Sequence, residues 1–208
     1  SPATPRLTNP GTVPSQGRER CLQPVPLESD FTLAFSNDQA AAFELRVFLD
    51  YIADGQAKEA VFGPTTMFVD DVRCSQQSNF CYRFGSQEIL RSFRRQVEDE
   101  PSNSLRYEAD DAQRCAVDIA DLPRVLRFEL TSMDRHLFLY RQANGPQVGN
   151  VNTVRPEYTN VSGPEGSITL GILGSYETAF SFGRLSDCSE FLLNFNGTPQ
   201  PNPACAFQ

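Results

Sequence analysis

The sequence predicts a mainly β fold, an antiparallel β-sandwich or jelly-roll-like domain with one short α-helix and disulfide staples. Three observations support this prediction. Short segments alternate apolar and polar residues, and turn signals separate them roughly every 8–12 residues. Only one segment has strong amphipathic helical spacing. The chain also contains six cysteines at irregular spacing among its 208 residues, which is typical of disulfides.

Residues 1–20 form the first segment and contain four prolines with few large apolar side chains. They cannot bury a core, so we expect an extended or disordered arm. If the arm is ordered, it could add a strand to a neighbouring subunit. Residues 21–208 are expected to form one β-sandwich domain, and the alternative is two lobes at 21–100 and 105–208.

The first half of the domain is dominated by strand patterns. Period-two alternation from Phe43 to Tyr51 favours a strand over the competing helix that Ala40–Ala42 suggest. Asp54-Gly55 is a hairpin signal that follows it directly. The other strands predicted in this half are Phe31–Phe35, Thr65–Val72 and Phe80–Phe84.

Residues 86–98 give the predicted helix, with Ser86 as its cap and Pro101 beyond its end. Its apolar face comprises Ile89, Leu90, Phe93 and Val97. The opposite face carries Arg91, Arg94 and Arg95, and acidic residues follow at 98–100. We interpret these charges as a solvated face with Arg–Glu pairs four residues apart. The alternative is a basic patch for phosphate or a sulfated polysaccharide.

A second run of strand patterns fills the C-terminal half. The predicted strands are Val125–Leu130, Leu137–Tyr140, Ser167–Leu173, Tyr176–Phe182 and Phe191–Phe195. Asn144-Gly145-Pro146 is a predicted turn.

The cysteines indicate an oxidising compartment. They are Cys21, Cys74, Cys81, Cys115, Cys188 and Cys205. Without a C-x-x-C motif, and with a single histidine, a zinc site is disfavoured, so three disulfides are expected. Six cysteines allow fifteen connectivities. The favoured one pairs Cys74 with Cys81, Cys188 with Cys205, and Cys21 with Cys115.

Several features fit a secreted or cell-surface glycoprotein. The chain begins with Ser1-Pro2-Ala3 rather than methionine, which fits a signal peptide already removed. Asn160 and Asn196 stand in N-x-S/T sequons and are predicted glycosylation sites. No apolar run approaches the ~20 residues that span a bilayer. The net charge of −8 argues against nucleic-acid binding.

The sequence has few patterns that indicate catalysis. His136 stands at the start of a predicted strand, and neither a G-x-S-x-G elbow nor a spare thiol is present to act as its nucleophile. Acidic pairs are more numerous, and calcium binds carboxylate and carbonyl oxygens in loose geometry. A structural calcium ion is therefore a candidate cofactor, and the alternative is that these carboxylates are solvated. The candidate ligands are Asp70, Asp71, Asp110 and Asp111.

Two local patterns resemble secreted families. Met67-Phe-Val-Asp-Asp-Val72 resembles a late strand of jelly-roll carbohydrate-binding and adhesion modules, in which an aspartate often supports calcium. Within residues 124–184, Val125–Leu130, Leu137–Arg141, Asn144-Gly145 and Gly174-Ser-Tyr176 resemble the pre-peptidase C-terminal type of β-sandwich. That resemblance implies an accessory binding or assembly domain.

The function predicted from these features is a non-enzymatic extracellular or cell-surface module for adhesion, ligand binding or assembly of an extracellular structure. Its partner would be a protein, a glycan or another copy of the chain. Two alternatives stay open. One is a secreted glycan-acting hydrolase that uses a carboxylate pair. The other is a filament or coat subunit that docks through its N-terminal arm.

Overall fold

The structure, a computed structural model, describes residues 6–9, 12–14, 19–36, 40–69, 80–101, 103–109, 114–123, 125–144, 174–195 and 205. Its twelve strands in these ranges confirm the predicted mainly β class. They are β1 (Arg6–Asn9), β2 (Thr12–Pro14), β3 (Arg20–Leu22), β4 (Pro24–Val25), β5 (Phe31–Ser36), β6 (Ala42–Ala53), β7 (Gln56–Phe68), β8 (Phe80–Phe84), β9 (Arg106–Tyr107), β10 (Cys115–Ala116), β11 (Leu126–Met133) and β12 (Tyr176–Leu185).

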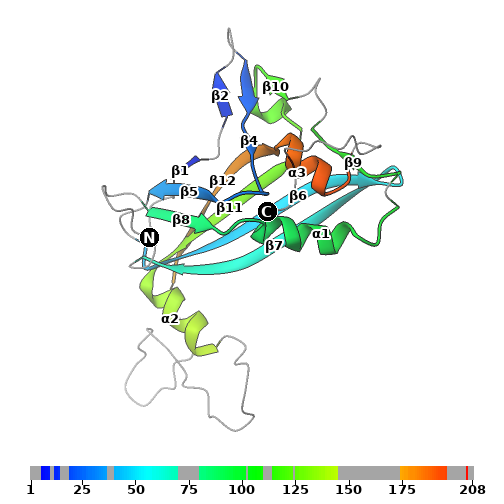
Figure 1. Ribbon diagram of the computed structural model, residues 1–208. Coiled ribbons are helices and arrows are strands. Elements are labelled where there is room, and N and C mark those ends of the chain that lie inside the picture. Colours follow the sequence, from blue (N-terminus) through cyan, green and yellow to red (C-terminus); the bar gives the residue numbers. More distant parts are fainter. Residues whose placement is uncertain are drawn as a thin grey trace, which may run out of the picture.

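A six-stranded main sheet organises the molecule. Its strand order is β4-β12-β11-β6-β7, and the short β9 also pairs with β6. The four long strands are antiparallel and curve together (Figure 1). The predicted 43–51 strand lies at its centre as β6, and this confirms the strand interpretation over the helical one.

One face of the main sheet carries the core. The alternate residues Phe43, Leu45, Val47 and Leu49 of β6 are fully buried. The second sheet, β1-β5-β8, packs on this face through aromatic side chains. The ring centroids of Phe31 and Phe128 lie 6.2 Å apart, and those of Phe35 and Phe43 lie 4.8 Å apart.

The tight turn between β6 and β7 forms where the sequence predicts it. Asp54 and Gly55 have φ values of 51° and 73°, as a type I′ hairpin requires. However, β7 starts at Gln56, directly after the turn, and not at Thr65 as predicted. The strand continues through Gly63, and its pairing with β6 shifts register there, between Leu45 and Val47.

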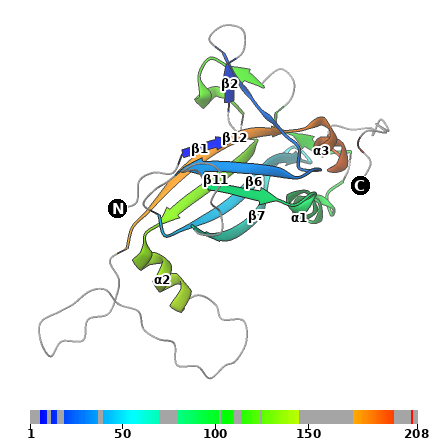
Figure 2. The same cartoon turned by 60° about the vertical axis from the view of Figure 1, so that its left-hand side comes forward.

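The predicted helix is α1 (Glu88–Val97), and all four predicted apolar residues on it are buried. Ser86 is not its cap. The residue at the N-cap position is Gln87, whose left-handed backbone has φ 63° and whose side chain makes no capping bond. The Ser86 hydroxyl instead donates to the Glu28 carbonyl, at 3.0 Å. α1 lies on the same side of the main sheet as β5 and β8 (Figure 2).

The prediction of a single helix is wrong, because two predicted strands are helical. Leu137–Tyr140 lies in α2 (Arg135–Asn144), and Phe191 and Leu192 end α3 (Asp187–Leu192). Capping residues explain both. Leu137 N–H donates to Asp134 Oδ1 at 2.8 Å, and Ser189 N–H donates to Ser186 Oγ at 3.1 Å. A 3₁₀ turn also spans Ile119–Asp121.

Two disulfides join segments far apart in the sequence. Cys21 and Cys115 are bonded across the paired strands β3 and β10, and Cys188 in α3 is bonded to Cys205. Both are expected pairings. Cys81 is also disulfide-bonded, and its expected partner Cys74 lies outside the described residues.

The N-terminal arm contains the short strands β1 and β2. They pair within the chain, β1 with β5 and β2 with β3. No helix among the described residues is long and apolar enough to cross a membrane. The predicted strand at 167–173 and the predicted turn residues 145 and 146 lie outside the described residues.

Asp134 holds the junction between α2 and β12. Its carboxylate accepts hydrogen bonds from the Leu137 N–H, from the Ser175 N–H at 2.6 Å and from the Ser175 hydroxyl at 2.8 Å. Partial burial disfavours the charged carboxylate, but these bonds outweigh burial and hold the Asp134 pKa below its usual value.

Replacing Asp134 with alanine should lower the free energy of unfolding by about 1 kcal/mol at pH 7. A lowered pKa means that the carboxylate stabilises the fold above its unfolded-state pKa. This contribution is lost as pH falls through the folded-state pKa. Urea unfolding should therefore show a smaller difference in unfolding free energy between the variant and the wild type below pH 4 than at pH 7. Asp121→Ala, at an exposed position, serves as the control, and a pH-independent difference would contradict this role for Asp134.

Candidate functional site

The two edges of the main sheet differ in how far they are covered. β7 forms one edge. On the other side, β4 pairs with β12 only at Arg184 and Leu185. Within the described ranges, no strand forms a backbone ladder with residues 176–183 of β12 on the side away from β11, although β1 lies close to β12. Exposed strand edges are templates for pairing with another chain, so proteins usually protect them.

The β7 edge carries several protective features. The Gln96 side chain of α1 reaches the middle of the strand, where its Oε1 accepts from Val61 N–H and its Nε2 donates to Val61 O, each at 2.9 Å. Lys58 forms an ion pair with Glu100, which raises the pKa of the lysine ammonium. Pro64 further along the strand has no N–H to offer a partner. Another strand therefore meets blocked backbone groups on β7.

The β12 edge shows the opposite pattern. Arg184 N–H donates to Gln23 O at 2.8 Å, so the backbone N–H of Arg184 points away from β11. Strand period two then places the backbone N–H and C=O of Thr178, Phe180 and Phe182 on the same edge. The Phe180 side chain is 54% exposed, and no lysine or proline interrupts residues 176–183.

The outer face of the main sheet, which adjoins the β12 edge, carries paired charges and aromatic rings. The Arg127 guanidinium lies 4.3 Å above the Phe48 ring and 2.9 Å from Glu59. Glu44 contacts both Arg46 and Arg141, at 2.9 and 2.6 Å. These pairs neutralise charge locally. Aromatic residues and arginine are also the residue types enriched at protein–protein interfaces.

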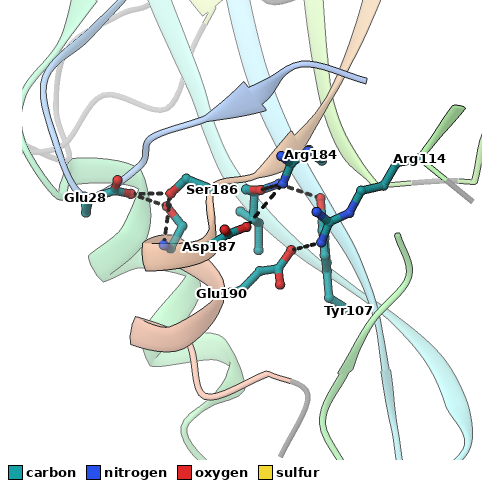
Figure 3. Close-up of polar contacts among 9 residues, drawn as sticks. Glu28, Tyr107, Arg114, Arg184, Ser186, Asp187 and Glu190 are labelled. Carbon is teal, nitrogen blue, oxygen red and sulfur yellow. Dashed lines mark hydrogen bonds and ion pairs between the residues drawn. The ribbon is translucent and has the colours of Figure 1, made fainter. Parts of the chain in front are cut away.

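A polar cluster fixes α3 against the end of β12 (Figure 3). Glu28 Oε2 accepts hydrogen bonds from the hydroxyls of Ser186 and Ser189, and Ser189 Oγ in turn accepts from Leu27 N–H at 3.0 Å. Ser189 is fully buried. Because these partners satisfy the hydroxyls internally, we interpret the cluster as structural rather than as a nucleophile site.

On the other side of α3, two ion pairs and a tyrosine complete this cluster (Figure 3). Arg114 lies 3.5 Å from Glu190, and Arg184 lies 3.5 Å from Asp187. The buried Tyr107 hydroxyl accepts a hydrogen bond from Leu185 N–H at 2.8 Å. Burial raises the Tyr107 pKa far above its usual value, so the phenol stays neutral.

The predicted calcium ligands and glycosylation sites all lie outside the described ranges. They are Asp70, Asp71, Asp110, Asp111, Asn160 and Asn196, so calcium binding and glycosylation stay predictions. Among the residues that the structure does describe, no three His, Cys, Asp or Glu side chains gather into a possible metal site. His136 lies in the first turn of α2, and not at the start of a strand.

The arginine face of α1 makes contacts within the helix. Arg91 donates to Gln87 Oε1 at 3.4 Å, and Arg95 Nε donates to the Arg91 carbonyl at 3.3 Å. The partners of Arg91 and Arg95 are therefore not the acidic residues that the four-residue spacing predicts. Gln96 of the same helix reaches Val61 of β7, and the sequence analysis does not single this residue out.

Comparisons of the chain with protein-family models, with curated proteins and with solved structures find no match. The functional interpretation therefore depends on the geometry of the molecule itself.

Replacing Tyr107 with phenylalanine should leave the buried Leu185 N–H without its hydroxyl partner. The expected loss in the free energy of unfolding is about 1–3 kcal/mol, the usual cost of an unsatisfied buried donor. Denaturant titration measures it. Tyr176→Phe, at a residue 62% exposed, removes the same atom and should have almost no effect. Equal losses in the two variants would contradict the importance of the Tyr107–Leu185 bond.

Proposed function

We propose that the chain is a non-enzymatic extracellular module that assembles with copies of itself through the β12 edge. The observation that supports this proposal is that the two edges of the main sheet differ in how far they are protected. The Gln96 side chain of α1, the Lys58–Glu100 ion pair and a proline protect β7, whereas no described strand forms a backbone ladder with residues 176–183 of β12 on the side away from β11, although β1 lies close to β12. Adding a strand to such an edge is a common mode of protein recognition.

The sequence of the β12 edge suits an antiparallel pair with itself. If Phe180 lies opposite Phe180 of a second copy, Thr178 lies opposite Phe182 in both directions. This register pairs no two like charges among the edge residues. An aromatic pair contributes about 0.5–1.5 kcal/mol beyond its burial. The short strand therefore gives a specific contact with an apolar centre.

The acidic net charge acts against this association. Each copy carries −8, so two copies repel each other at low ionic strength. Salt screens charges beyond about 10 Å at 0.1 M, whereas the strand contact itself is short-ranged. Association through β12 should therefore strengthen as salt is added.

The disulfides support the extracellular part of the proposal. Cys21–Cys115 joins β3 to β10, and Cys188–Cys205 joins α3 to a residue 17 positions further along the chain. Such bonds persist in oxidising compartments and are rare in the cytosol.

Replacing Phe180 with lysine should weaken self-association at least tenfold, because it places like charges opposite each other at the centre of the strand pair. Sedimentation equilibrium of the disulfide-intact chain at 0.15 M salt measures the effect. Thr66→Lys adds the same charge to the protected β7 edge and should leave the association constant within about twofold. A monomeric wild type, or equal effects of the two variants, would contradict the proposal.

Replacing Gln96 with alanine should open the second edge. Val61 N–H and C=O then lose their side-chain partners and become available to another strand. A molecule with two open edges can form chains, so sedimentation velocity should show species larger than dimers. The double variant Gln96→Ala, Phe180→Lys should stop at dimers. If Gln96→Ala sediments like the wild type, the protective role of Gln96 is wrong.

A further inference from the structure

Strand β1 lies in the seam between the two packed sheets, next to the edge of β12. On one side it pairs with β5, the central strand of the second sheet. On the other side it approaches β12 more extensively than it approaches any other strand of the main sheet. Figures 1 and 2 both show β1 beside β12. Because no ladder joins these two described strands, β1 borders the edge of β12 without extending the main sheet.

The direction from which β1 approaches is compatible with the exposed ring of Phe180. The second sheet packs on the core face of the main sheet, so β1 reaches β12 from that face. Phe180 pairs with Glu129 of β11, whose neighbours Phe128 and Leu130 are buried in the core. Strand period two therefore places the Phe180 ring on the outer face. β1 can lie along the backbone edge while this ring stays exposed.

β1 is held less firmly than the next strand of the N-terminal arm. Its ladder with β5 contains three register pairs, and the register shifts between Leu7 and Asn9. Such a bulge leaves one residue of the strand out of the ladder. β2 pairs in regular register with β3, which the Cys21–Cys115 bond joins to β10. β1 can therefore leave its place while β2 stays paired.

The position of β5 does not depend on β1. β5 also pairs with β8, over five register pairs. Leu33 and Phe35 of β5 are fully buried, and the Phe35 ring centroid lies 4.8 Å from that of Phe43 and 5.8 Å from that of Phe80. Departure of β1 therefore breaks a short ladder but leaves this part of the core in place.

A strand that pairs with β12 needs the space that β1 borders. Paired strands lie about 4.8 Å apart. β11 occupies this position on one side of β12, so a second copy has to approach on the other side, where β1 lies close. The incoming strand and β1 therefore compete for the same edge.

We propose that β1 (Arg6–Asn9) is a displaceable guard of the β12 edge, which covers the edge in a single copy and moves aside when two copies pair. This inference rests on the proposed self-association through β12. Open strand edges can pair with other chains, and residues 176–183 contain no lysine or proline to prevent it. A short, irregularly paired strand can cover such an edge until a second copy replaces it.

The guard should lower the apparent affinity of self-association. A partner that binds only one conformation loses affinity in proportion to the fraction of molecules in that conformation. Both copies have to move β1 aside, so the apparent association constant falls with the square of the displaced fraction. A displaced fraction of roughly one third already lowers this constant about tenfold.

Replacing Leu7 and Thr8 together with proline tests the guard, because two successive prolines remove backbone donors on both edges of β1. Sedimentation equilibrium of the full disulfide-intact chain should give an association constant about tenfold above that of the wild type. The matched control, Thr12→Pro with Val13→Pro, breaks the pairing of β2 with β3 instead. Its association constant should stay within about twofold of the wild type.

Hydrogen exchange of the wild type gives a second measurement that needs no proline variant. The β5 amides that face β1 should exchange faster as the protein concentration rises and dimers form, because pairing displaces β1. The β5 amides that face β8 serve as the control and should not change. In the Phe180→Lys chain, exchange at both sets of amides should be independent of concentration.

The outcomes separate the guard from the proposed function. Equal association constants in the wild type and the β1 variant, or unchanged exchange of the β1-facing amides as dimers form, would overturn the guard and leave self-association through β12 intact. If neither the wild type nor the β1 variant associates, self-association is wrong, and the guard with it.

Discussion

The one-sided burial of β6 is the constraint on which the rest of the structure depends. Phe43, Leu45, Val47 and Leu49 point to one face of the main sheet and are fully buried. Glu44 and Arg46 alternate with them on the other face. The second sheet and α1 consequently cover the same side. The opposite face keeps paired charges and aromatic rings.

Covering only one side also makes the edges of the main sheet important. A helix packed beside β7 can reach over its edge, and Gln96 does so with both atoms of its side-chain amide. β4, at the other end of the sheet, is too short to cover more than the end of β12. The same packing that stabilises the core therefore leaves the two edges unequal.

The sequence predicts most long elements well and the site poorly. Alternation from Phe43 to Tyr51 identifies β6, because nine residues suffice to separate period two from helical spacing. Leu137–Tyr140 is too short for that distinction, and the capping role of Asp134 decides the helix instead. The β12 edge depends on strand order, which no local pattern contains. Gln96 acts on Val61 across 35 positions, and only the fold brings them together.

The Cys21–Cys115 bond gives the chain a mechanical property. It joins positions 94 residues apart, so a pull on the two ends of the chain passes through the sulfur atoms and bypasses the segment between them. Unravelling β5 to β9 would then add no length to a stretched chain while the bond is intact. After reduction, unravelling of the same strands would lengthen the chain, so the extensibility of the molecule depends on the redox state of its surroundings.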